Sequence, residues 1–132
     1  MGSIEEKAQK LIQSHGTNCP FALAKMLKIQ VIFEPLGKAL GYYNRSYRIK
    51  MIHINEMATE KQSRFICAHE LGHSLLHPEE NTPFLKKHTY FSTNRIEREA
   101  NDFAKALLFG SLTEDDEGIT LEELQTEYRV DI

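Results

Sequence analysis

Residues 65–77, FICAHELGHSLLH, place four ionisable side chains in a run that is otherwise apolar. Just before the run, Thr59 and Gln62 have the spacing of a capping box, which marks the first turn of a helix. Pro78 follows the run directly, and proline ends helices because it has no backbone N–H. The sequence therefore predicts a buried helix that carries ionisable groups, and these groups need a chemical reason.

Three of the ionisable residues, His69, Glu70 and His73, form the pattern H-E-x-x-H. Residues four apart lie one above the other on a helix, so both imidazoles can face one metal ion. Glu70 is rotated by about 100° from His69 and can reach a water on that ion without binding the ion itself. A helical glycine costs about 1 kcal/mol relative to alanine. Gly72 therefore indicates that another part of the chain approaches the helix backbone closely.

His77 continues the spacing of four residues but is not expected to be a ligand. A helix rises ~1.5 Å per residue, which separates His69 and His77 by ~12 Å along the axis. Bonds from zinc to nitrogen are only ~2.1 Å long, so one ion cannot join both ends of this series. We expect His77 to end the helix, where a basic residue interacts favourably with the helix dipole.

The third metal ligand is expected from a second helix, whose sequence RIEREANDFA offers two acids, Glu97 and Glu99. Helical periodicity alone does not choose between them, because both flank the apolar stripe around Phe103 at similar angles. Asn101 lies one turn after Glu97 and could orient its carboxylate, which favours Glu97. Glu99 is the alternative ligand, and the acid that does not bind is expected at the surface.

Composition excludes several classes of protein. Sixteen basic and 19 acidic residues among 132 give a formal charge of −3, which does not suit a protein that grips nucleic acid directly. No apolar stretch approaches the ~20 residues that span a bilayer, and the N-terminus lacks the pattern of a secretory signal. Cys19 and Cys67 have no second cysteine at ligand spacing and are expected to be reduced, buried thiols. We therefore expect a cytoplasmic protein.

The pattern of the whole chain predicts one α+β domain, residues 1–132, with a small three-stranded antiparallel sheet and about five helices. Strands are expected as a meander at 29–35, 39–44 and 47–55, and in the last one a change of apolar phase suggests either a bulge or apolar contacts on both faces. Helices are expected at 4–15, from Pro20 to about Leu27, from Thr59 to about His77, at about 94–109 and at about 120–129. Residues 78–93 are expected as a loop and 113–118 as an acidic linker.

Two motifs resemble those of the ImmA/IrrE-type metallopeptidases. RFICAHELGHSLLH (64–77) looks like the zinc helix of that family, and EREANDFAKALL (97–108) looks like its second signature. The resemblance covers about residues 20–110 and implies a minimal zincin fold of the gluzincin kind, with Zn²⁺ as cofactor. Carried over residue by residue, it makes His69 and His73 zinc ligands, Glu70 the catalytic base and Glu97 the third ligand.

The resemblance also implies a function. Family members typically cleave one transcriptional repressor of a phage, mobile element or stress response, so a protein substrate and a regulatory endopeptidase are expected. The alternative is a zinc-containing interaction module that sequesters a repressor without cutting it. His88 and Tyr90, in the loop between the two motifs, are candidate donors to the oxyanion. The strand 47–55 is a candidate edge for pairing with an extended substrate. Phe109-Gly110 departs from the family, which commonly has proline there.

Overall fold

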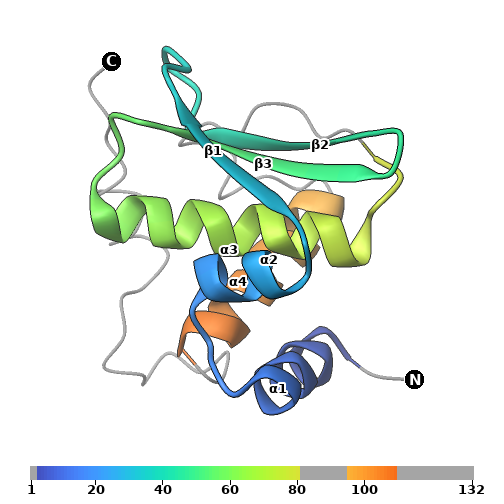
Figure 1. Ribbon diagram of the computed structural model, residues 1–132. Coiled ribbons are helices and arrows are strands. Elements are labelled where there is room, and N and C mark those ends of the chain that lie inside the picture. Colours follow the sequence, from blue (N-terminus) through green and yellow to red (C-terminus); the bar gives the residue numbers. More distant parts are fainter. Residues whose placement is uncertain (1–2, 81–94, 110–132) are drawn as a thin grey trace.

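Among the residues that the structure describes, seven helices and strands follow one another in the order that the sequence predicts (Figure 1). The structure is a computed structural model, and it describes residues 3–80 and 95–109. The elements are α1 (Ile4–His15), α2 (Pro20–Met26), β1 (Gln30–Glu34), β2 (Gly41–Ser46), β3 (Ile49–Asn55), α3 (Glu60–Leu76) and α4 (Arg95–Phe109). The predicted α+β class and the three strands are confirmed. The linker 113–118, the helix expected at 120–129 and most of the loop 78–93 lie outside the described residues.

Local signals account for the helix boundaries. Ser3 and Glu6 form a capping box at the start of α1, and Gly16 ends that helix in the left-handed conformation. Thr59 and Gln62 form the second capping box at the start of α3, as their spacing predicts. These signals act within a few residues of one another, which is why the sequence alone locates them.

The sheet is mixed, and its strand order is β1-β3-β2. β3 lies in the centre, antiparallel to β2 and parallel to β1. The prediction of a wholly antiparallel meander is therefore wrong for β1. The two strands β2 and β3 form the expected hairpin, with only Tyr47 and Arg48 between them and Tyr47 in the left-handed region (φ 59°). The register between them is unbroken, so no bulge forms within β3.

The connection between β1 and β2 explains the strand order. Residues 35–40 cross the end of β3, where the Asn55 amide donates hydrogen bonds to the carbonyl oxygens of Gly37 (2.9 Å) and Ala39 (2.8 Å). This crossing carries the chain from one side of β3 to the other, so β2 pairs on the far side from β1. Hydrogen bonds of this kind, between residues far apart in the sequence, leave no periodic pattern in it.

The sheet, α3 and then α4 with α1 form successive layers (Figure 1). α3 contacts the strands β2 and β3 on one side and α4 on the other, so almost all its residues from Gln62 to Ser74 are buried. Ile52 and Ile54 of β3 contribute to the core beside it. Cys67 is buried in α3, Cys19 is half-buried before α2, and both are free thiols. The two histidines and the glutamate of the H-E-x-x-H pattern are thereby enclosed in protein.

Gly72 confirms the expectation that something approaches the helix backbone. A Cβ atom there would lie 3.1 to 3.3 Å from three carbons of the Phe103 side chain, so α4 packs directly against the backbone of α3. Gly41 is tighter still. A Cβ at that position would lie 2.5 Å from the carbonyl oxygen of His53 and 2.6 Å from Cγ2 of Ile66. Both glycines allow close contact between α3 and a neighbouring layer.

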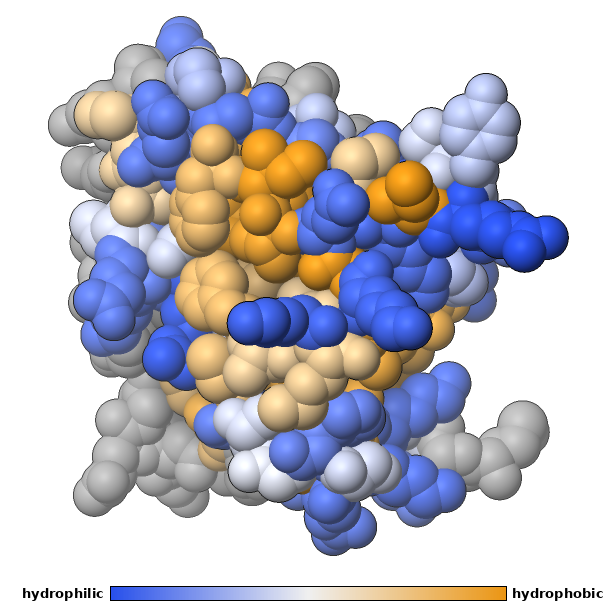
Figure 2. All heavy atoms as spheres, in the orientation of Figure 1, coloured by the Kyte–Doolittle hydropathy of each residue, from blue (hydrophilic) through white to orange (hydrophobic). Residues whose placement is uncertain are grey.

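Apolar side chains also gather at the surface, on the face of the molecule shown in Figure 2, over β1 and α2. Phe33 of β1 is half-exposed, and its ring lies 6.1 Å from the ring of Phe21 in α2. Met26 at the end of α2 is half-exposed as well. Within the described ranges, no helix combines the length and the apolar character needed to cross a lipid bilayer.

Replacing Gly41 by alanine should lower the free energy of unfolding by ~1–3 kcal/mol, the usual cost of forcing extra atoms into a packed interior. The added methyl group would collide with backbone of β3 and with Ile66 of α3. Urea denaturation would measure the change. Gly37→Asn is a suitable control, because asparagine tolerates the left-handed backbone there and no atom lies within 4 Å of its Cβ position. A Gly41→Ala protein as stable as the wild type would contradict this packing.

Candidate metal centre

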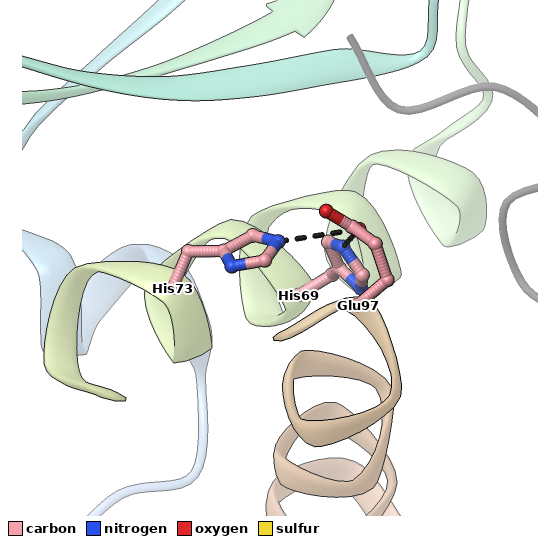
Figure 3. Close-up of side chains that lie close together, drawn as sticks. All are labelled: His69, His73 and Glu97. Carbon is pink, nitrogen blue, oxygen red and sulfur yellow. Dashed lines mark hydrogen bonds and ion pairs between the residues drawn. The ribbon is translucent and has the colours of Figure 1, made fainter. Parts of the chain in front are cut away.

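One helical turn of α3 presents His69 and His73 on the same side, towards α4 (Figure 3). Both side chains are fully buried, with exposed fractions of 0% and 1%. Their Nε2 atoms point to the same place, where they meet one carboxylate. This arrangement follows from the spacing of four residues in an unbroken helix.

The carboxylate belongs to Glu97, in the first turn of α4. Its Oε1 atom lies 3.0 Å from Nε2 of His69 and 3.3 Å from Nε2 of His73. Three ligand atoms, one from each residue, lie within 4.8 Å of one another. Ligand atoms around a tetrahedral zinc ion are ~3.4 Å apart, given bonds of ~2.1 Å. The spacing of these three atoms and their chemical type therefore suit a metal site.

Glu70 provides an independent test of whether a cation fits here. Its carboxyl group is 1% exposed, and neither of its oxygens has a hydrogen-bond partner in the part of the chain that the structure describes. Burial raises the pKa of Glu70 well above its ordinary value, and the nearby charge of Glu97 raises it further. Oε2 of Glu97 is likewise buried without a partner among these residues. Burying carboxyl oxygens without a hydrogen-bond partner is energetically costly, and a cation or a water bound to that cation would satisfy them.

The protonation states of the other two groups suit metal binding. Burial lowers the pKa of the His73 imidazole to about 4, against the opposing effect of its hydrogen bond to Glu97. Burial alone would raise the pKa of Glu97, but its contacts with the His69 and His73 rings outweigh burial and lower that pKa to about 2. At neutral pH the site therefore holds a neutral imidazole and a carboxylate, the forms in which these side chains bind metals.

Asn101 lies beside the site and contacts one of its imidazoles. Its Oδ1 atom accepts a hydrogen bond from Nδ1–H of His69 at 2.8 Å, and the side chain is buried. Asn101 lies one turn after Glu97 on α4, as the sequence predicted, and its hydrogen bond to His69 is a contact that the sequence did not predict. With its Nδ1 occupied in this way, His69 is free to offer the lone pair of Nε2 to a metal.

His77 and Glu99 stand outside the group of three. His77 ends α3, as expected, and its Nε2 atom lies 2.6 Å from Oε1 of Glu99. Glu99 is therefore paired and only partly exposed, where we expected whichever acid did not bind to be solvated at the surface. The spacing of four residues between His73 and His77 was a signal that could have indicated that these two rings lie close together. The candidate oxyanion donors His88 and Tyr90 lie outside the described residues.

Comparison with known proteins agrees with the motifs. Residues 24–130 match the IrrE N-terminal-like domain, a peptidase family. The chain belongs to this family. Immunity region protein 2 of Bacillus phage phi105 is 42% identical over 106 residues, which are 80% of this chain and 67% of that protein. Metallopeptidase ImmA of Bacillus subtilis (strain 168) is 34% identical over 107 residues, 80% of this chain and 62% of that protein. The chain thus spans about two thirds of these relatives.

Membership of the ImmA/IrrE family confirms the resemblance drawn from the two motifs. The match extends from residue 24 to residue 130, further along the chain than the motifs themselves reach. A metallopeptidase family requires a metal, and the group of His69, His73 and Glu97 is the one found among the residues that the structure describes.

The two acids of α4 should differ clearly in metal binding. Glu97→Ala removes the carboxylate that both imidazoles face, so zinc affinity should fall by more than the ~10–100-fold that losing an outer hydrogen-bond partner costs. The loss of zinc affinity in Glu99→Ala should not exceed that range. Competition with a chromophoric chelator would measure both affinities. Zinc retention in Glu97→Ala equal to that of the wild type would exclude Glu97 as a ligand.

Proposed function

We propose that this protein is a zinc-dependent endopeptidase that cleaves a specific regulatory protein, such as the transcriptional repressor of a phage or mobile element. The observation that carries the proposal is the convergence of two imidazoles and one carboxylate next to a buried carboxyl group that has no hydrogen-bond partner among the described residues. A site that serves only to stabilise a fold needs four ligands and has no use for an adjacent base.

In this proposal His69, His73 and Glu97 hold the zinc ion. Two nitrogen ligands and one oxygen ligand leave a coordination position open, as in catalytic rather than structural zinc sites. When bound, zinc supplies a Lewis acid that activates water at neutral pH and polarises a peptide carbonyl. The choice of zinc rests on this donor set, because imidazole with one carboxylate is a common catalytic zinc ligation.

Glu70 acts as the general base and then as the general acid. It follows His69 directly on α3, so its side chain points to a different side of the helix from the two imidazoles. From there it takes a proton from the attacking water and later delivers that proton to the leaving amine nitrogen. The proton returns to the product, and Glu70 ends the cycle in the state in which it began.

An extended substrate is proposed to pair with β2. The strand 47–55, first expected to offer this edge, is β3, which lies in the centre of the sheet and is paired on both sides. β2 (Gly41–Ser46) is an edge strand, with β3 as its single neighbour among residues 3–80 and 95–109. The sheet passes above the three side chains of the metal centre (Figure 3). Pairing with β2 would hold a peptide main chain by hydrogen bonds and admit little sequence preference by itself.

The regulatory role is supported by the relatives. One is named for the immunity region of a phage and the other is named a metallopeptidase. A proteolytic regulator of phage immunity would meet its repressor in the cytoplasm and would need no nucleic-acid contact of its own. The alternative, a zinc-containing module that sequesters a repressor without cutting it, does not use Glu70.

Glu70→Gln separates the two functions. Glutamine has nearly the same shape but cannot accept the proton, so the rate of cleavage should fall by ~10²–10⁴-fold. Zinc stoichiometry and the thermal unfolding midpoint should stay close to those of the wild type. The purified, zinc-loaded proteins would be incubated with the repressor encoded beside the gene, and the products followed by gel electrophoresis and mass spectrometry.

Glu60→Gln is the matched control, because Glu60 is exposed in the first turn of the same helix and far from the site. It should cleave at the wild-type rate. If Glu70→Gln relieved repression as well as the wild type does, the hydrolytic function would be wrong and the interaction module would be favoured.

A further inference from the structure

His73 has a second ring nitrogen, and this atom also has a partner. Its Nδ1 lies 3.2 Å from Nδ1 of His77, one turn further along α3. Nε2 of His77 in turn lies 2.6 Å from Oε1 of Glu99 on α4. Three side chains from two helices thus form a continuous series, Glu99 to His77 to His73, that ends at the metal centre.

The position of the protons in this series follows from its geometry. If Nε2 of His73 binds a metal, the proton of that neutral ring must sit on Nδ1. Nδ1 of His73 then donates to His77, so Nδ1 of His77 must be the acceptor and carry no proton. The proton of His77 is therefore on Nε2, which faces the carboxylate of Glu99. Each hydrogen bond fixes the next one.

We propose that His77 and Glu99 are positioning residues, which hold the His73 ring in the orientation and tautomer that metal binding needs. This inference rests on the zinc site proposed above. It gives His73 the counterpart of what Asn101 gives His69, a hydrogen-bond acceptor for the ring nitrogen that faces away from the metal. Residues in such outer positions commonly change metal affinity ~10–100-fold when they are removed.

The surroundings hold the three side chains of this series in place, because most of their surface is covered by protein. The His77 side chain is 9% exposed and that of Glu99 is 31% exposed. The backbone N–H of His77 donates to the carbonyl oxygen of His73 at 2.7 Å, which places the two rings on the same side of α3. Their ring centroids are 5.4 Å apart. A ring held by its own backbone and by a carboxylate from α4 loses little further freedom when it accepts the bond from His73.

A double-mutant cycle on zinc affinity tests the proposal. His77→Phe keeps an aromatic ring and removes the acceptor, so the zinc dissociation constant should rise ~10–100-fold. Glu99→Ala should raise it less, because His77 remains. In the double variant the loss should equal that of His77→Phe alone, since Glu99 acts only through His77. His15→Phe is the control: His15 also lies at the end of a helix, bonds the carbonyl oxygen of Leu11, and should leave affinity unchanged.

A second measurement does not depend on any variant that alters the core. The ¹⁵N chemical shifts of the His77 ring in the zinc-loaded wild type should show the proton on Nε2, and Glu99→Ala should shift the ring towards a mixture of tautomers. A wild type that binds no zinc would overturn the proposed function and this inference with it. Normal zinc binding with an unaffected His77→Phe, with losses that multiply in the double variant, or with the His77 proton on Nδ1, would overturn the inference alone.

Discussion

The close contact between Gly72 of α3 and the Phe103 ring of α4 is the constraint on which the rest of the site depends. Any side chain at residue 72 would place its first carbon 3.1 to 3.3 Å from three carbons of the Phe103 side chain, nearer than the ~3.5–4.0 Å at which carbons attract each other best. Residue 72 precedes His73, so this close contact lies next to a proposed metal ligand in the chain. At this separation a glutamate and an asparagine on α4 are long enough to reach imidazoles on α3.

The same contact sets the register of α4 against α3. Glu97, Glu99 and Asn101 meet His69, His73 and His77 in four pairings. A shift of α4 by one residue would rotate each of these side chains by about 100° and break all the pairings together. Close packing fits the Phe103 ring against the bare backbone at Gly72, and this fit selects the register of α4 against α3. The polar contacts between the two helices then follow from the sequence of α4.

Much of this arrangement could be predicted from the sequence because the signals are local. The capping boxes at Ser3 and Thr59 define helix starts from residues three positions apart, and the spacing of His69 and His73 places them on one face without knowledge of the fold. Gly72 predicted a close neighbour without identifying Phe103. The strand order could not be predicted, because it depends on Asn55 binding a connection of the chain that lies some sixteen to eighteen residues earlier.

The partners across the two helices were beyond prediction for a related reason. A helix determines which side chains share its face, but which group of the opposite helix each one meets depends on rotation and register between the two. The sequence placed Asn101 one turn after Glu97, but it did not predict the hydrogen bond from His69 to Asn101. Periodicity did not decide between Glu97 and Glu99 as the third ligand, because both acids flank the apolar stripe of α4. The structure shows why the pattern was ambiguous, because Glu97 meets His73 within the candidate metal centre and Glu99 meets His77 beside it.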